Sequence, residues 1–398
     1  MSKQDHSLEP IPMSSPDLTA AEREAVAAVL RTPRLSMGPE EKGFEAAIAE
    51  YVGVEHAIAV NSGTSGLHIC VRAASIGEQD LVITTPYSFV SSTNVLLYER
   101  AVPVFVDIDP QTGNLDPAQV EQAAHDLGQG GAAAARWLPR KGAENPGPLK
   151  ALISVDVFGQ PADYDRLKTV VDAHGIVLIE DSCEALGAKY KARNVGTFGD
   201  LAVFAFYPNK QITTGEGGMV VTNRQDWADV ARALRNQGRA PGDTWLSHSC
   251  LGYNYRIDEM SAALGRAQMG RLDTLLEKRA QVAVWYNERI SEIPGIEIPQ
   301  VVADTTRMSW FVYVVRFTPD VDRDVLVGRL AQRGIPARPY FAPIHLQTYM
   351  QERFGYRLGD YPLTEDVGQR SLALPFSSVM GEGQVDRVCQ CLRELVRP

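Results

Sequence analysis

Short apolar runs alternate with stretches of helical spacing along the first two thirds of the chain. The apolar runs predict strands at Ala57–Val60, Asp80–Thr84, Val102–Val106, Leu149–Val155, Ile176–Ile179, Leu201–Phe206 and Gly218–Thr222. The amphipathic stretches predict helices at Leu18–Leu30, Ser65–Ala74, Ser91–Tyr98, Pro117–Leu127, Tyr164–His174 and Trp227–Asn236. Because strand and helix follow each other regularly, the pattern predicts an α/β fold, with a mostly parallel seven-stranded sheet sandwiched by helices.

The last third of the chain has a different pattern. It predicts one long helical segment over Asp258–Ile293, a strand at Trp310–Phe317, and helices at Asp322–Arg333 and Gln384–Val396. Since 398 residues exceed one compact core, we expect a large domain over residues 1–255 and a smaller α+β C-terminal domain over residues 256–398. The Gly-, Ala- and Pro-rich segment Gly128–Pro148 is expected to be an exposed loop.

One lysine, Lys210, follows a predicted strand and lies in a turn rich in glycine and threonine. Apolar neighbours would desolvate its ammonium and free the amine to act as a nucleophile. Asp181 ends another predicted strand, so both groups should lie at the same edge of the sheet. Taken alone, Lys210 could be an ordinary surface lysine, and Asp181 could be a helix cap. Together they predict a site for pyridoxal 5'-phosphate (PLP), which needs a lysine for its Schiff base and a carboxylate for its ring nitrogen.

Two further segments fit the same cofactor. Ser62, Gly63 and Thr64 open a predicted helix, where backbone N–H groups, hydroxyls and a glycine make a phosphate site. A simple N-cap is the alternative. Phe89, or as second choice Tyr87, follows a strand at the place where a ring could stack on the flat pyridine, although both could also pack into the core.

Composition narrows the partners. A net charge of −10 and a pI near 5.3 disfavour nucleic acid and anionic membranes as partners. Five scattered cysteines without a Cys-x-x-Cys pair indicate reduced thiols and predict neither a disulfide framework nor a metal site. The N-terminus shows no targeting signal and no apolar stretch is long enough to span a membrane, so a cytoplasmic location is expected.

Several motifs occur in an order typical of one family: Gly38-Pro39, Ser62-Gly63-Thr64, Ser88-Phe89-Val90, Glu180-Asp181, Phe206-Tyr207-Pro208-Asn209-Lys210 and Gly252-Tyr253-Asn254-Tyr255-Arg256. From Pro10 to the C-terminus the chain resembles the DegT/StrS-type nucleotide-sugar aminotransferases, a branch of the fold type I PLP-dependent transferases. The resemblance implies that Lys210 carries the Schiff base, Asp181 pairs with the ring nitrogen, Gly63 and Thr64 hold the phosphate, and Phe89 stacks on the ring.

The resemblance also implies a reaction and a partner. An amino group would pass from L-glutamate, through pyridoxamine phosphate, to a nucleotide-linked keto-deoxysugar, in polysaccharide, lipopolysaccharide or natural-product sugar biosynthesis. Asn254 would reach the phosphate of a neighbouring subunit, which implies a homodimer with shared active sites. Arg338, Tyr340 and His345 would face the substrate, and His345 fits a packed loop histidine equally well.

The chain departs from the family at three positions. Glu184 stands where a glutamine commonly touches the cofactor's phenolic oxygen, Ala205 where a serine is usual, and Asp156 where many relatives have histidine. Two alternatives stay open: a sugar dehydratase that uses pyridoxamine phosphate, and a non-catalytic regulator of the same fold. Dehydratases of this kind have histidine at the lysine position, so Lys210 opposes the first. A decarboxylating or β-eliminating PLP enzyme is excluded only by the family motifs.

Overall fold

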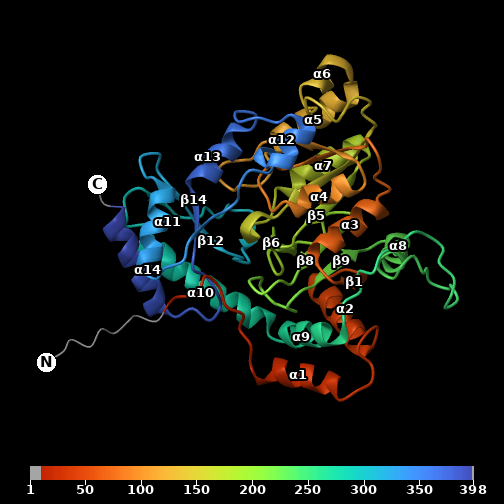
Figure 1. The fold of residues 1–398 in the computed structure, drawn as a ribbon, viewed down its shortest axis with the longest axis horizontal. Coiled ribbons are helices and arrows are strands. Elements are labelled where there is room, and N and C mark those ends of the chain that lie inside the picture. The colour runs from red at the N-terminus through yellow and green to blue at the C-terminus, as the bar shows by residue number, and fades with distance from the viewer. Residues whose placement is uncertain (1–9, 397–398) are drawn as a thin grey trace.

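A computed structural model describes residues 10–396 (Figure 1). Residues 1–9, part of the segment without a predicted targeting signal, lie outside the described residues, as do residues 397 and 398. The central sheet has seven strands in the order β1-β9-β8-β5-β4-β2-β3. The strands are β1 (His56–Val60), β2 (Leu81–Thr84), β3 (Val102–Phe105), β4 (Leu149–Val155), β5 (Val177–Asp181), β8 (Leu201–Ala205) and β9 (Gly218–Thr222). Only β9 runs antiparallel to its neighbours in this sheet, which confirms the predicted mostly parallel sheet.

Helices cover both faces of this sheet. They are α2 (Pro39–Val52), α3 (Gly63–Ala73), α4 (Ser91–Tyr98), α5 (Pro117–Gln129), α7 (Tyr164–His174) and α8 (Gln225–Arg235). Alternate residues of a strand face opposite sides. Ile58 and Val60 therefore pack in one core with α3, α4 and α8, whereas Ala57 and Ala59 pack in another with α2, α5 and α7. The sheet is thus sandwiched by helices, as predicted.

A smaller unit follows in the C-terminal third, drawn in teal and blue in Figure 1. A four-stranded antiparallel sheet has the order β10 (Ile296–Glu297), β12 (Tyr313–Phe317), β14 (Ser371–Leu374) and β13 (Arg338–Pro339). With α11 (Arg323–Gln332) and α14 (Glu382–Leu395) it encloses a separate core, to which the second half of α10 (Leu272–Ile290) also contributes. Leu275 and Leu276, in the first half of α10, belong to the core of the large sheet. The helix α10 therefore joins the two cores.

The single helical segment predicted over Asp258–Ile293 is wrong. The structure has two helices there, α9 (Glu259–Met269) and α10, because Arg271 leaves helical geometry at φ −125° and ψ 5°. The guanidinium of Arg271 binds Asp17 and Glu22, which lie before and within α1 (Ala20–Leu30). The α9 helix consequently packs against α1 and α2.

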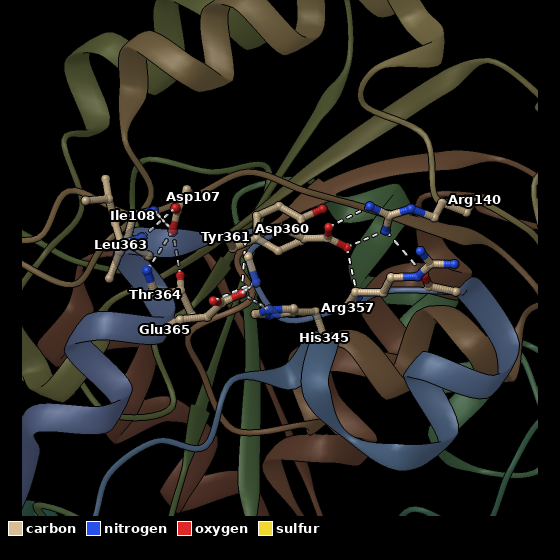
Figure 2. A network of polar contacts seen from close by, with 12 residues as sticks. Asp107, Ile108, Arg140, His345, Arg357, Asp360, Tyr361, Leu363, Thr364 and Glu365 are labelled. Atoms are coloured by element: carbon tan, nitrogen blue, oxygen red, sulfur yellow. Dashed lines mark hydrogen bonds and ion pairs between the residues drawn. The ribbon is translucent and has the colours of Figure 1, made fainter.

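The prediction that Gly128–Pro148 is an exposed loop is only partly confirmed: most of its residues are exposed, and residues 136–148 form no helix or strand, but the segment also contains helix and buried contacts. The segment starts with the end of α5 and the short helix α6 (Gly131–Ala135). Trp137 is then partly buried against the main core, and its Nε1 donates to Asp126 Oδ2 at 2.8 Å. Arg140 binds both carboxylate oxygens of Asp360, as Figure 2 shows. The segment is therefore packed onto the C-terminal part of the chain.

Other elements were not predicted. They are α2, α12 (Thr348–Phe354), α13 (Pro362–Arg370), β10, β13, β14, and a small sheet of β11 (Thr305–Arg307), β6 (Lys189–Tyr190) and β7 (Arg193–Asn194). The strand predicted from Trp310 starts only at Tyr313, because Trp310 has a φ of 52°. None of the helices between residues 10 and 396 combines the length and apolar character that crossing a bilayer requires.

Candidate active site

A cavity of about 440 Å³ lies at the carboxyl ends of the central strands. This is the edge at which open parallel sheets bind ligands. Its walls come from segments far apart in the sequence: the start of α3, the segment before α4, the ends of β5 and β8, and the loop after β13. The predicted residues Ser62, Gly63, Thr64, Phe89, Asp181, Glu184, Lys210, Arg338 and Tyr340 all line it.

Lys210 lies in a closed turn that follows β8. The turn is held by backbone hydrogen bonds from Lys210 to Tyr207 (2.9 Å) and from Thr214 to Phe206 (3.0 Å). The side chain is 12 % exposed, and its Nζ lies 3.5 Å from Glu184 Oε1 and 3.7 Å from the ring centroid of Phe311. A carboxylate and an aromatic face therefore hold the amine inside the cavity, out of bulk water.

Asp181 is the last residue of β5 and is buried. Its Oδ2 accepts a 2.6 Å hydrogen bond from Ser92 Oγ, and its Oδ1 accepts a 3.3 Å bond from the Cys183 N–H. Hydrogen bonds of this kind fix the direction of a carboxylate. Ser92 was not predicted as a site residue, because its place in α4 gives no signal in the sequence that it meets Asp181.

Glu184 extends the acidic side of the cavity. Its Oε2 accepts from the backbone N–H of Phe158 at 3.0 Å, which leaves Oε1 toward Lys210. Burial raises the pKa of the Glu184 carboxyl, while the nearby Lys210 ammonium lowers that pKa. The carboxylate that replaces the family's common glutamine is thus paired directly with the lysine.

The N-terminus of α3 faces the same cavity. Ser62 is the N-cap, and its Oγ accepts from the Ser65 N–H at 3.1 Å. Among the described residues the N–H groups of Gly63 and Thr64 have no acceptor, as expected for the first turn of a helix. A Cβ on Gly63 would lie 2.7 Å from the Cβ of Ala205, so only glycine lets the backbone approach β8 this closely.

The two aromatic candidates separate clearly. Phe89 is 61 % exposed and lines the cavity, where its ring is free to face a ligand. Tyr87 is fully buried, and its hydroxyl donates to the Tyr340 carbonyl at 2.8 Å. Tyr87 therefore packs beneath the loop after β13 and supports Tyr340 from below.

Two predicted residues do not reach this cavity. His345 is fully buried, and its Nε2 lies 2.9 Å from Glu365 Oε1 in the network of Figure 2. Burial lowers the pKa of His345. Asn254 is exposed, and its backbone carbonyl accepts from Asn61 Nδ2 at 3.4 Å. In one chain, the structure gives neither side chain a place on the wall of the cavity.

The groups that meet in the cavity fit PLP. A lysine amine, a buried carboxylate held by a hydroxyl, and unpaired N–H groups at a helix N-terminus match its aldehyde, ring nitrogen and phosphate. The tight approach of Gly63 to Ala205 makes a cradle that a Cβ would fill. Lys210 would hold the aldehyde carbon, Asp181 the ring nitrogen and Gly63 with Thr64 the phosphate.

Comparison with known proteins identifies the family. The model of the DegT/DnrJ/EryC1/StrS aminotransferase family matches residues 16–393, so the chain belongs to this family. A GDP-perosamine synthase from Caulobacter vibrioides is 36 % identical, over 97 % of this chain and 98 % of that protein.

Solved structures of similar proteins support the same family assignment. The structure of S. venezuelae DesV in complex with a ketimine intermediate has a TM-score of 0.86 and 32 % identity, over 98 % of this chain and 100 % of that one. The PLP form of the putative sugar aminotransferase Spr1654 from Streptococcus pneumoniae has a TM-score of 0.86 and 25 % identity, over 97 % and 98 %. The chain therefore has the fold of PLP-dependent sugar aminotransferases and is one of them.

Proposed function

We propose that this PLP-dependent sugar aminotransferase moves the amino group of L-glutamate to the ketone of a nucleotide-linked deoxysugar. The observation that carries the proposal is the meeting of Lys210, Asp181 and the N-terminus of α3 in one cavity of about 440 Å³. The names of two relatives support the sugar: a GDP-perosamine synthase from Caulobacter vibrioides and another from Escherichia coli O157:H7.

The chain's own residues have distinct tasks in this reaction. Bound PLP supplies an electron sink for the carbanion formed at the donor's α-carbon. When Lys210 Nζ is not bonded to the cofactor, it is placed to take the α-proton of the amino donor and to deliver that proton to the cofactor. Asp181, oriented by Ser92, keeps a proton on the ring nitrogen. Glu184, 3.5 Å from Nζ, stabilises the ammonium that forms while Lys210 holds the proton.

A nucleotide-linked substrate brings negative charge to the mouth of the cavity. Arg338 lies on the exposed strand β13 at this mouth, and a guanidinium binds a diphosphate through paired hydrogen bonds. Tyr340, next to Arg338 in sequence, presents its side chain to the same cavity. We assign substrate recognition to these two residues. His345 would act on the substrate only through the loop that it anchors.

The proposal includes a homodimer with active sites shared between subunits. Asn254 is exposed and does not reach the cavity of its own chain, so the resemblance gives it a place at the phosphate of a second copy. We also propose a cytoplasmic location, because all five cysteines are free thiols, as in reducing compartments.

The experiment is a substrate panel. Purified enzyme with PLP and L-glutamate is incubated with nucleotide-linked 3-keto and 4-keto sugars, and the aminosugar and 2-oxoglutarate are measured by mass spectrometry. Lys210→Ala should abolish turnover and the covalent adduct that borohydride forms between lysine and PLP. Lys191→Ala, which removes an exposed lysine paired with Asp165, is the control and should keep both. Loss of a sugar hydroxyl as water, with the keto group retained and no amine transferred, would point instead to a dehydratase.

A further inference from the structure

Arg279 is a buried arginine on the helix that joins the two cores. It lies on α10 between Leu276, in the core of the large sheet, and Val282, in the C-terminal core. Its side chain is among the largest that are fully buried, with 2 % of the residue exposed. Its place at the junction raises the question of what the guanidinium binds.

The guanidinium binds four backbone carbonyls. Nη2 donates to the carbonyls of Lys210 (2.6 Å) and Asn209 (3.1 Å). Nη1 donates to the carbonyls of Trp310 (3.1 Å) and Phe311 (3.2 Å). One planar group thus ties the turn that carries Lys210 to the segment that precedes β12.

No carboxylate pairs with Arg279 among the ion pairs of the described residues. Burial lowers the pKa of Arg279 to about 10, which still leaves it charged at neutral pH. A buried charge without an opposite charge is costly and persists only where dipoles are fixed around it. The four carbonyls are those dipoles, so the guanidinium and the two backbone segments depend on each other.

Both segments form part of the active site. Phe311 presents its ring 3.7 Å from Lys210 Nζ, and Trp310 reaches this geometry through a left-handed backbone with φ 52°. A tryptophan in this region is strained. The hydrogen bond from Arg279 to the Trp310 carbonyl helps to hold that conformation.

We propose that Arg279 is a positioning residue for Lys210. By binding carbonyls of both the lysine turn and the Phe311 segment, Arg279 fixes the distance between these segments. It thereby keeps the Lys210 amine between Glu184 and the Phe311 ring. The inference rests on the proposed role of Lys210 in the active site.

The test is hydrogen exchange, followed by mass spectrometry, in the cofactor-free protein. Arg279→Lys keeps the charge but cannot bind four carbonyls, and Arg279→Met keeps only the stem. We expect three amides to exchange about tenfold faster in both variants: those of Lys210 and Thr214, which donate to carbonyls within the lysine turn, and that of Phe311, which donates to the Phe158 carbonyl. Lys278→Met, one residue earlier on α10, removes an exposed charge and is the matched control.

The outcomes separate positioning from stability. Faster exchange confined to the two segments, with unchanged exchange in β9, supports the proposal. Partial restoration in Arg279→Ala by millimolar guanidinium ion also supports it. Unchanged exchange in the two segments of Arg279→Lys, or an equal increase in β9 and throughout the core, would overturn it. Because no cofactor, substrate or turnover enters the measurement, its result is independent of whether the proposed amino transfer is correct.

Discussion

Asp156 is a buried carboxyl group next to the strand end that carries Asp181. Its Oδ1 accepts from the Tyr164 hydroxyl (2.7 Å) and the Ala162 N–H (2.9 Å), and its Oδ2 accepts from Ser182 Oγ (2.6 Å). Burial, reinforced by the charge of Glu180, raises the pKa of Asp156 to about 7. Asp156 is therefore a buried acid whose carboxyl group is held by three hydrogen bonds and titrates near neutral pH.

This pKa predicts how stability depends on pH. Between the unfolded pKa of about 4 and the folded value, the native protein binds one more proton than the unfolded chain, so its stability falls as pH rises. Asp156→Asn should remove this component, since an amide keeps the acceptor for Tyr164 and donates to Ser182. When the pH rises from 5 to 7, we expect the free energy of unfolding to fall by about 2 kcal/mol more in the wild type than in Asp156→Asn.

Urea denaturation at several pH values measures that difference. Asp165→Asn, an exposed carboxylate paired with Lys191, is the control and should follow the wild type. Parallel stability curves for the wild type and Asp156→Asn across this range would contradict the prediction.

At the scale of elements, the start of α3 requires a glycine at position 63. A Cβ on Gly63 would lie 2.7 Å from the Cβ of Ala205 and 2.9 Å from Cys183 Sγ, closer than such atoms approach. Gly63→Ala should therefore push α3 from β8 and misplace the N–H groups that face the phosphate. We expect PLP affinity, measured by titration of the apoenzyme, to fall by at least about tenfold.

Two variants check this explanation. Gly77→Ala places a Cβ where no atom lies within 4 Å and should leave PLP affinity unchanged. Adding Ala205→Gly to Gly63→Ala removes the nearest colliding carbon and should restore part of the affinity. A double variant no better than Gly63→Ala would show that the collision is not the cause.

The elements also show what a sequence can predict. The seven strands were predicted because strands buried on both faces leave continuous apolar runs. Helix α2 was missed although it has signals: Pro39 at its first turn, Gly53 after its end, and Phe44 and Ile48 at helical spacing. Strands of two residues, such as β6 and β7, leave no such pattern, because their partners alone define them.

The site divides in the same way. Lys210, Asp181 and Gly63 follow strands that end at one edge, so topology brings them together. Ser92 and Phe311 come from a helix and a loop whose approach depends on packing. The hydrogen bonds of Arg279 go to backbone carbonyls, and every residue carries a carbonyl. No residue type marks such a partner, so the sequence could not indicate it.

At the scale of the whole molecule, the segment after α5 connects distant parts of the chain. In Figure 2, Arg140 meets Asp360, and the neighbouring residues Tyr361 to Glu365 lead to His345. Glu365 accepts from the Gly359 N–H and pairs with His345, which anchors the loop after β13. The loop that carries Tyr340 is thus supported from outside the cavity.

Arg140→Ala should loosen this support only locally. Arg140 is about half exposed, so we expect a loss of about 1 kcal/mol or less in stability. Thermolysin should cut near Trp137 and Leu138 faster than in the wild type, while turnover stays close to normal. Arg100→Ala removes an exposed pair with Glu78 and should leave cleavage unchanged. Equal cleavage in the wild type and Arg140→Ala would contradict this role.

The largest-scale prediction concerns the second copy of the chain. If Asn254 completes the site of the neighbouring subunit, Lys210→Ala in one subunit and Asn254→Ala in the other damage the same site of a mixed dimer. One site then has the alanine of both variants, and the other has both native residues. Each variant alone should be inactive or strongly impaired, because Asn254→Ala removes a phosphate contact from both sites of its own dimer.

Unfolding and refolding the two variants together in equal amounts should restore about one quarter of wild-type turnover, because half the dimers are mixed and each has one intact site. Lys210→Ala mixed with Asp181→Ala is the control, since both residues line the cavity of one chain. In that mixed dimer each site lacks one of the two residues, so the mixture should recover no activity. Recovery would require that Lys210 and Asp181 serve different subunits. Mass spectrometry should first show that mixed dimers have formed. If the Lys210→Ala and Asn254→Ala mixture is then no more active than either variant alone, Asn254 lies outside the shared site.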